Sequence, residues 1–419
     1  MTTSPAPSVP RTDSPRVRTD RRGWRELTPP VADDPALEVS VVMPCLNEAE
    51  TLEGCITSAA RALHLADIRG EIIVADNGST DGSPAIGAGL GARVIDVAER
   101  GYGSALMGGI RAARGRYVIM GDADASYDFG EIPNFVRELR RGYDIVQGCR
   151  LETGGGTVRP NAMRFLHRWW GNPMFSRMAR WWFRAPIHDI HCGMRGFDRQ
   201  YWFRLDQHCT GMEFASEMII KAALHGARLG EVPITLHPDG RTAHRSHLRT
   251  FRDGWRHLRF FLMYSPKWLF LMPGALFVAL GLLGYVIAMP RLTLFGATFD
   301  VHTLLFASLA IILGYQSILF AFLTRIFGMT AGFLPDDARM MQLFRFLNLE
   351  RGLVIGAITA VLGVGLLALA VNAWRLAGFG ALDYVPTMRV VIPGVTLTAI
   401  GVQTVFSSFF FSIIGLARR

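Results

Sequence analysis

Four uncharged apolar runs fill most of the last third of this 419-residue chain, at about residues 268–289, 303–324, 352–374 and 390–417. Each has roughly the 20 residues that an α-helix needs to cross the hydrocarbon core of a bilayer. Half of the chain is hydrophobic and only 19% is charged, which suggests an extramembrane domain joined to membrane spans. We therefore predict a four-helix transmembrane domain over 267–419.

Arginines between these runs indicate how the chain crosses the membrane. Four spans place both ends of the chain on one side, where the arginines are Arg325, Arg339, Arg345, Arg351, Arg418 and Arg419. The opposite loops carry only Arg291, Arg375 and Arg389. Loops rich in positive charge stay in the cytoplasm. We therefore predict a multi-pass protein of the inner or plasma membrane whose large N-terminal domain and both termini are cytoplasmic.

The net charge of +9 comes almost entirely from arginine, because lysine occurs only at positions 221 and 267. In a chain with membrane spans this charge favours anionic lipid headgroups and phosphorylated ligands as partners, and we predict no nucleic-acid partner. The five cysteines are scattered, odd in number and without CxxC pairs. We interpret them as reduced thiols in a cytosolic compartment.

The N-terminal segment differs in composition from the rest of the chain. Residues 1–30 are rich in Pro, Ser, Thr and Arg and contain no apolar stretch of the kind a secretory signal needs. We predict a disordered basic tail over 1–36.

From residue 37 onward, short β-branched runs alternate with Ala-rich amphipathic stretches. Four runs read as strands, at 38–44, 71–75, 92–97 and 116–121. Strands that alternate with helices predict an α/β domain over 37–240, with a mostly parallel sheet and helices on both faces. Ligands of such sheets bind at the carboxyl ends of the strands, where this chain has polar residues at 44–48, 76–81 and 122–128.

The stretch 241–266 joins the two predicted domains and is amphipathic. Its arginines recur every three or four residues, at positions 241, 245, 249, 252, 256 and 259. Leu248, Phe251, Trp255, Leu258 and Leu262 follow the same rhythm. From Arg245 onward the two sets form neighbouring stripes on a helix, which suits a helix lying in the membrane interface. The alternative is an ordinary domain helix whose charges are solvated.

The segment 120–133, "MGDADASYDFGEIP", follows an apolar run with alternating carboxylates. In an extended segment Asp122 and Asp124 face the same way, so both can approach one hard cation such as Mg²⁺ or Mn²⁺. A calcium loop is excluded, because Tyr127 and Pro133 replace the glycine and glutamate that such a loop requires. Asp128 serves equally well as a turn or cap residue and as a ligand.

Several motifs in order resemble a known enzyme family. "VSVVMPCLNEAETL", "EIIVADNGSTDGS" and "GYGSALMGGIRAARGRYVIMGDADASYDF" resemble the signatures of family 2 glycosyltransferases with the Rossmann-like GT-A fold. "DIVQGCR", "DIHCGMRGF", "GMEFASEMIIKA" and "EVPITLHPDGRTAHRSHLRTFRDG", with the trailing spans, look like the branch of dolichol-phosphate mannose and glucose synthases. The resemblance covers roughly residues 38–265. It implies a metal-dependent transfer of a hexose from a nucleotide sugar to a polyprenyl or dolichyl phosphate, with inversion.

This resemblance also implies roles on the donor side. The residues matched to the base and ribose pocket are Pro44, Asn47, Glu48 and Asp76. From its position alone, Glu48 could equally be a carboxylate in the first turn of a helix. Gly101 and Gly103 allow close backbone approach at a helix start, which favours a diphosphate. Asp122 is expected to be catalytic and to contact both donor and metal, while Asp124 binds the metal.

On the acceptor side, the nucleophile is an anionic phosphate oxygen, so a strong base is less necessary. The resemblance makes Asp189 the candidate base or orienting carboxylate, with a polar loop as the alternative reading. Arg150 and Arg245 match positions that grip the acceptor phosphate, and Glu217 matches an acidic position. His247 stands where lysine is common, which departs from the family pattern. Zinc at the neighbouring His188, His191 and Cys192 is disfavoured, since there is one cysteine and no second cluster.

Other functions compete with this hypothesis. A non-catalytic binding module should lack the metal carboxylates, and a transporter should carry charges inside its spans. The motif at 342–346, "QLFRF", has Phe where processive synthases have Trp and lies beyond the second span. UDP-glucose is favoured as donor because "DADASYDF" resembles the bacterial glucose branch, with GDP-mannose as the alternative. We expect small residues such as Gly356, Gly363 and Gly365 to pack the spans together, with homo-oligomerisation through these helices as an option.

Overall fold

The structure is a computed structural model that describes residues 31–241, 250–294, 296–331, 334–335, 337, 342 and 349–416. Its contacts divide the chain into two compact units, which are described separately. One unit is Met1–Ser176 with Pro186–Ser246, and the other is Arg177–Ala185 with His247–Arg419. Most of the predicted tail, residues 1–30, lies outside the described residues.

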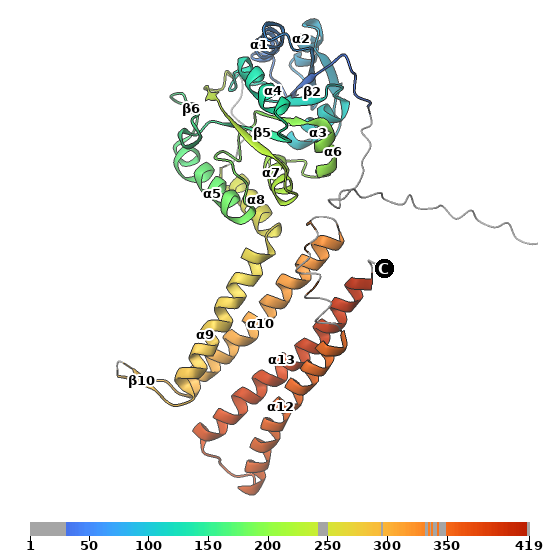
Figure 1. Ribbon diagram of the computed structural model, residues 1–419. Coiled ribbons are helices and arrows are strands. Elements are labelled where there is room, and N and C mark those ends of the chain that lie inside the picture. Colours follow the sequence, from blue (N-terminus) through green and yellow to red (C-terminus); the bar gives the residue numbers. More distant parts are fainter. Residues whose placement is uncertain are drawn as a thin grey trace, which may run out of the picture. The chain divides into compact units, whose positions relative to one another are not determined.

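A seven-stranded sheet forms the centre of the first unit (Figure 1). Its order is β3 (Arg93–Asp96), β2 (Gly70–Asp76), β1 (Val39–Cys45), β4 (Tyr117–Met120), β7 (Arg195–Asp198), β5 (Ile145–Cys149) and β8 (Leu229–Pro233). All neighbouring strands are parallel except β7, which runs antiparallel to β4 and β5. The mostly parallel sheet and the four expected strands are therefore confirmed, whereas the reversed strand β7 was not predicted.

The sheet carries helices on both faces. They are α1 (Leu52–Leu65), α2 (Ser83–Gly89), α3 (Tyr102–Ala112), α4 (Ile132–Arg140), α6 (Arg199–Leu205) and α7 (Phe214–Leu224). Helix α5 (Asn172–Phe183) begins in this unit, but its residues from Arg177 onward belong to the second unit. In β1, Val41 and Met43 join the core cluster that contains the buried side chains of α1 and α4. The intervening Val42 contacts Gly109 of α3 instead. This alternation is what a strand buried on both faces requires.

Short elements complete the first unit. They are η1 (Phe129–Glu131), η2 (Glu152–Gly154), β6 (Thr157–Val158), the π-helical turn η3 (His167–Gly171) and β9 (Thr235–Leu236), which pairs with β6. Asp128 accepts a hydrogen bond from the Gly130 amide at 2.8 Å and thereby caps η1. Its role as a cap, one of the two readings left open, is therefore the one that the structure supports.

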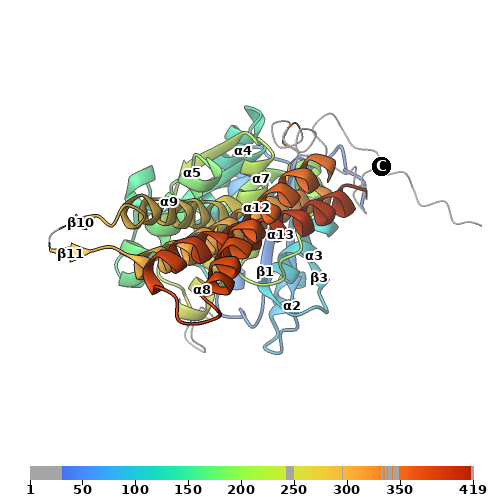
Figure 2. The ribbon, with the colours of Figure 1, turned by 90° about the horizontal axis from the view of Figure 1, so that it is seen from below.

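Four long apolar helices dominate the second unit. The candidate spans are Lys267–Ala288, Val301–Thr330, Leu349–Leu376 and Tyr384–Ile414, each long and apolar enough to cross a membrane. They comprise η4 (Lys267–Leu271) with α9 (Met272–Ala288), α10 (Val301–Thr330), α12 (Leu349–Leu376) and α13 (Tyr384–Leu416). A small hairpin, β10 (Thr293–Leu294) and β11 (Ala297–Thr298), joins the first pair. The four predicted spans are thus confirmed (Figures 1 and 2).

Glycines allow these helices to pack closely in pairs. A Cβ on Gly274 of α9 would lie 2.8 Å from the Gly314 carbonyl of α10. Gly356 and Gly363 of α12 contact α13 in the same way, so their predicted packing role is confirmed. Gly365 has no such neighbour within 4 Å, so the prediction was wrong for that residue.

Helix α8 (Thr250–Met263) precedes the first span and confirms that this part of the predicted amphipathic stretch is helical. Phe251 and Trp255 are exposed, while Phe260 and Phe261 are buried. Phe261 packs edge-on against Trp182 and Phe183 within the same unit. Residues 242–249, including Arg245, lie outside the described residues. Contact of the exposed aromatic side with a membrane stays a prediction.

Candidate active site

The polar ends of three adjacent strands meet at one edge of the sheet. In the order β2–β1–β4, the last residues of β1 pair with those of β2, so that Pro44 lies beside Ala75 and Cys45 beside Asp76. Asp122 and Asp124 follow the end of β4. The topology therefore brings together three loops that are far apart in the sequence, as the α/β pattern predicts.

Asp122 and Asp124 form a pair of carboxylates with different surroundings. The Tyr102 hydroxyl donates to Asp122 Oδ1 at 2.9 Å, while Asp124 Oδ1 accepts from the amide of Ser126 at 3.0 Å and from its hydroxyl at 2.5 Å. Burial raises the pKa of Asp122 to about 7, with a further contribution from the Asp124 charge and opposition from the Tyr102 hydrogen bond. A Cβ on Gly193 would lie 2.8 Å from Asp122 Oδ2, so glycine leaves room at that oxygen.

These oxygens suit a hard divalent cation. Mg²⁺ is commonly bound by one or two carboxylates together with waters and substrate phosphates. Within the described residues, no group of three or more His, Cys, Asp or Glu side chains could hold a metal. A cation at Asp122 and Asp124 would therefore need further oxygen ligands from a bound substrate.

Arg241 is a site residue whose position the sequence did not predict. Its Nε contacts Glu48 Oε1 and Oε2 at 3.0 and 2.9 Å, and its Nη2 contacts Glu48 Oε1 at 2.8 Å and Asp124 Oδ2 at 3.1 Å. All three side chains are buried or nearly so. Glu48, expected at the base and ribose pocket, is thus engaged by a guanidinium. Glu48 and Arg241 are separated by 193 positions, which explains why no motif revealed the pair.

Asn47 and Asp76 hold the loops that follow β1 and β2. Asn47 has a left-handed backbone with φ of 59°, and its side-chain oxygen accepts from the Thr80 amide at 2.8 Å. Asp76 Oδ2 accepts from the amides of Gly78 and Ser79 at 3.0 and 3.1 Å. Both side chains shape the loops through backbone contacts, and their donor-binding role, like that of Pro44, stays a prediction.

At the start of α3, Gly101 and Gly103 make room for a loop of the protein and not for a ligand. A Cβ on Gly101 would collide with the Thr210 carbonyl, and a Cβ on Gly103 with the Cys209 carbonyl. The amides of Gly103 and Ser104 both donate to the Thr210 oxygen, at 2.9 and 3.2 Å. Residues 209–211 therefore account for the close backbone approach at the start of α3. Because the amides of Gly103 and Ser104 already donate to Thr210, they are not available to a diphosphate in this arrangement.

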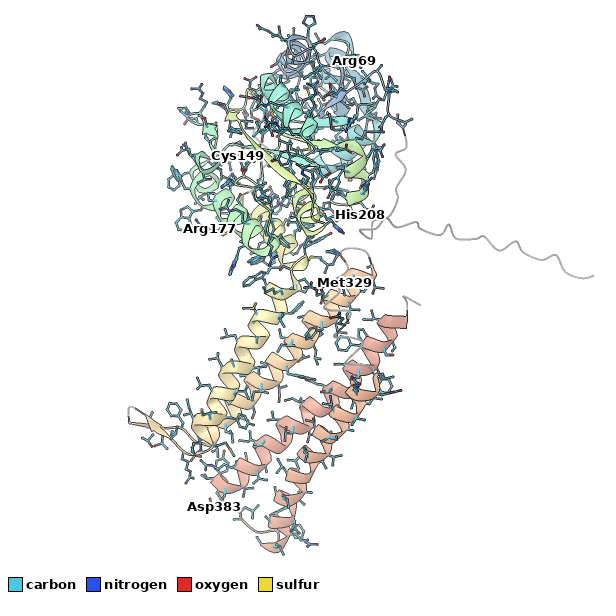
Figure 3. The ribbon with its side chains drawn as sticks, in the orientation of Figure 1. Arg69, Cys149, Arg177, His208, Met329 and Asp383 are labelled. Atoms are coloured by element: carbon cyan, nitrogen blue, oxygen red, sulfur yellow. The ribbon has the colours of Figure 1, made fainter. Side chains whose placement is uncertain are left out.

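Glu217 anchors that loop from α7. It accepts from the amides of His208, a residue labelled in Figure 3, and of Cys209 at 2.9 to 3.1 Å. Lys221 pairs with Glu217 at 2.8 Å and also donates to the Asp206 carbonyl at 2.6 Å. Because Glu217 and Lys221 are almost fully buried, the acidic position expected from the family pattern has a loop-holding role in the structure.

Asp189 and Arg150 form a bidentate buried pair. Arg150 Nε contacts Asp189 Oδ2 at 2.7 Å, Nη2 contacts Oδ1 at 2.9 Å, and the Arg150 amide donates to Oδ2 at 3.1 Å. Burial works to lower the pKa of Arg150, but the Asp189 carboxylate outweighs it and holds that pKa well above its ordinary value. Of the two roles proposed for Asp189, this arrangement favours the orienting one, because both oxygens are already occupied.

The loop that carries Asp189 is held from β8 and from β5, whose last residue, Cys149, is labelled in Figure 3. Glu231 of β8 accepts from the amides of His188 and Asp189 at 2.7 and 3.1 Å and contacts His188 Nδ1 at 2.8 Å. Gln147 of β5 donates to the carbonyls of Asp189 and Cys192, both at 3.0 Å. His191 instead contacts Asn172 at 3.1 Å. His188 and His191 therefore have different partners, Glu231 and Asn172.

Comparisons with known proteins identify the family of this chain. The sequence profile described as Glycosyl transferase family 2 matches residues 40–203, and the one described as Glycosyltransferase family 2 C-terminal transmembrane region matches residues 322–415. The Low-salt glycan biosynthesis hexosyltransferase Agl6 of Haloferax volcanii is 38% identical over 397 residues, which cover 93% of this chain and 92% of that protein. This chain is a family 2 glycosyltransferase.

Other similar proteins match about half of the glycosyltransferase. The Dolichyl-phosphate hexose transferase of Haloferax volcanii is 32% identical over 198 residues, 47% of this chain and 82% of that protein. Among solved structures, glucosyl-3-phosphoglycerate synthase from Mycobacterium tuberculosis has a TM-score of 0.41 and 22% identity, covering 54% of this chain and 78% of that one. The profiles and the relatives together make this chain a hexosyltransferase, with a GT-A domain followed by four candidate transmembrane helices.

The glycosyltransferase contains two buried side chains at this site that sequence reasoning missed. Tyr127 accepts from the Gly193 amide at 2.8 Å and so ties the segment 120–133 to the loop that carries Asp189. Arg195 is fully buried and donates to the Ala215 and Cys192 carbonyls at 2.8 and 2.6 Å. The Tyr127 contact spans 66 positions and the contact of Arg195 with Ala215 spans 20, and neither residue type signalled them.

An exposed apolar surface on the first unit was also missed. Large apolar side chains are exposed in and around η3 and the start of α5, namely Phe165, Leu166, Trp169, Trp170 and Met174. A concentration of exposed aromatic residues of this kind marks an interaction surface. The sequence itself shows this pattern, because Arg164 precedes Phe165 and Leu166, and Arg168 precedes Trp169 and Trp170.

Proposed function

We propose that this family 2 glycosyltransferase transfers a hexose from a nucleotide sugar to a polyprenyl or dolichyl phosphate at the cytoplasmic face of a membrane. One observation carries the proposal: the carboxylates Asp122 and Asp124 directly follow a strand of a domain whose chain continues into four candidate membrane spans. An enzyme with its own membrane anchor has direct access to a lipid acceptor. A relative named for dolichyl phosphate supports the same acceptor class.

The proposed reaction needs no strong base, because the attacking phosphate oxygen is already anionic. One acceptor phosphate oxygen forms a bond to the anomeric carbon while the bond from that carbon to the donor diphosphate breaks. The electron pair leaves with the nucleoside diphosphate, and the configuration inverts. A divalent cation, Mg²⁺ or Mn²⁺, held by Asp122 and Asp124 would supply positive charge against the departing diphosphate.

Arg150 is the described residue best suited to the acceptor phosphate. Asp189 takes its Nε and Nη2 atoms, which fixes the guanidinium plane and leaves Nη1 for an incoming phosphate. Arginine suits this task because its charge is permanent and its donors are directional. We propose Asp189 as the residue that positions Arg150, while Arg245, outside the described residues, remains a proposed second phosphate ligand.

The arginines support the proposed topology. Under the positive-inside rule their distribution supports a cytoplasmic location for the catalytic domain and both termini. The exposed aromatic side chains of α8 and of residues 165–174 suit contact with a bilayer surface, where Trp and Phe are favoured.

A donor panel tests this function. The full-length protein, purified and reconstituted with polyprenyl phosphate and Mg²⁺, is offered labelled UDP-glucose and GDP-mannose separately. We expect label in the lipid phase with UDP-glucose, and loss of that transfer when a chelator removes the divalent cation. Transfer from GDP-mannose alone would replace the favoured donor by its alternative, and no lipid label with any common nucleotide sugar would overturn the proposal.

A further inference from the structure

One guanidinium bridges two carboxylates on the donor side of the site. Arg241 binds both oxygens of Glu48 through Nε, and its Nη2 spans from Glu48 Oε1 to Asp124 Oδ2. Its side chain is only 11% exposed, and those of Glu48 and Asp124 are 6% and 11% exposed. Buried carboxylates this close need positive charge nearby, and Arg241 supplies it.

Backbone pairing positions Arg241 at these carboxylates. Leu236 forms a bridge with Tyr127, the His237 amide donates to the Ser126 carbonyl at 2.9 Å, and the Gly240 amide donates to the Asp124 carbonyl at 2.8 Å. A Cβ on Gly240 would lie 2.9 Å from Thr51 Cγ2, so glycine allows this close approach. The segment before Arg241 therefore runs antiparallel to residues 124–127 and delivers its side chain to Asp124.

We propose that Arg241 is an exchangeable counter-ion that competes with a divalent cation for Asp124 and so sets the cation affinity of the site. This inference rests on the proposed use of Asp122 and Asp124 as cation ligands. Asp124 Oδ1 is already bonded to Ser126, so Oδ2, the oxygen that Arg241 contacts, is the one a cation would take. A guanidinium on the same oxygen repels that cation, so cation binding requires Nη2 to leave Asp124.

Glu48 gives the displaced guanidinium a place to stay. Three of the four contacts made by Arg241 are to Glu48, and they do not depend on Asp124. The exchange therefore needs only a small rotation of the guanidinium that moves Nη2 away from Asp124 while Nε stays on Glu48. Without the donor, Arg241 balances the negative charge of Glu48 and Asp124. A cation then binds tightly only when other ligands, such as the diphosphate, contribute.

The test measures Mn²⁺ binding to the full-length protein without nucleotide, from the electron paramagnetic resonance signal of free Mn²⁺. Arg241→Gln should bind Mn²⁺ about tenfold more tightly than the wild type, a coupling of ordinary size. Arg140→Gln is the matched control, because Arg140 pairs bidentately with Glu38 at 2.7 Å and does not contact the site. Its Mn²⁺ affinity should match that of the wild type.

Two further variants identify the site and guard against misfolding. Asp124→Asn in the Arg241→Gln background should remove the gain in affinity. Arg241→Lys keeps the charge but lacks the fork that spans Glu48 and Asp124, so it should show a smaller gain. Equal or weaker Mn²⁺ binding by both folded Arg241 variants would overturn this inference. Failure of the wild type to bind Mn²⁺ even with UDP present would instead overturn the metal site of the proposed function.

Discussion

Both oxygens of the Asp189 carboxylate are held by Arg150, and the amide of Asp189 is held by Glu231. A carboxylate bound in this way fixes the orientation of a guanidinium and is poorly placed to accept a proton. The motifs located Asp189 and Arg150 separately. Their pairing across 39 positions depends on the antiparallel strand β7, which no local pattern predicted.

Replacing Asp189 by Asn separates these two roles. We expect Asp189→Asn to lower transfer and also to destabilise the first unit by about 3 kcal/mol, because a buried guanidinium loses its counter-charge. Thermal unfolding and the transfer assay are measured together. Glu152→Gln, which breaks an exposed pair with Arg168, is the control and should change neither. Loss of transfer with unchanged thermal stability would indicate a base instead.

His225 at the end of α7 is expected to make stability depend on pH. Burial, with a smaller contribution from the Lys221 charge, lowers its pKa from 6.5 to about 4. The unfolded chain therefore binds a proton below pH 6.5 that the folded protein refuses, so stability falls from pH 6.5 to about 4 and no further through this group. His225→Gln should reduce that loss of melting temperature, whereas His64→Gln, at an exposed position of α1, should not. Identical pH profiles for His225→Gln and wild type would contradict the assignment.

At the scale of elements, the family resemblance located the two glycines at the start of α3 but did not predict what they contact. The glycines at 101 and 103 were expected to admit a diphosphate, and in the structure they admit the carbonyls of Cys209 and Thr210. That loop is held by Glu217 and Lys221 of α7, more than 100 positions along the chain. Spacing alone could not distinguish a ligand from a distant loop.

A pair of glycine substitutions tests this loop contact. Gly103→Ala should destabilise the first unit by about 2 kcal/mol, because the new Cβ meets the Cys209 carbonyl. Gly54→Ala, in α1 with nothing within 4 Å of its Cβ, should raise stability by up to about 1 kcal/mol. Thermal unfolding reports both effects. If Gly103→Ala were as stable as Gly54→Ala, the loop contact would be wrong.

Helices α12 and α13 offer a similar test inside the membrane unit. Gly363→Leu should separate the pair and lower the temperature at which the detergent-solubilised protein aggregates, because Gly363 contacts the backbone of α13 at Thr398. Gly365→Leu, two positions along the same helix, has no neighbour within 4 Å and should have little effect. Equal losses from both substitutions would show that α12 and α13 do not pack through Gly363.

At the scale of the whole molecule, the sequence predicted what depends on local pattern. Four spans follow from runs of apolar residues, and the α/β domain follows from alternating strands and helices. Contacts between distant segments were missed, above all Arg241 on Glu48 and Asp124, because no periodicity encodes them. Carboxylates and their spacing were visible in the sequence, whereas their counter-ions required the fold.

The proposed function explains why one chain contains both a GT-A domain and four candidate spans, because the acceptor is a lipid. Transfer should therefore require a lipid phosphate and the carboxylates after β4. The most direct measurement is the acceptor-dependent appearance of labelled hexose in the lipid phase, for the wild type and for Asp124→Asn in the same membranes. We predict transfer by the wild type only when polyprenyl phosphate is present, and a loss of at least about a hundredfold in Asp124→Asn, on the scale of removing a group that stabilises the transition state. Unchanged transfer by a folded Asp124→Asn, or no lipid label from the wild type, would contradict the account.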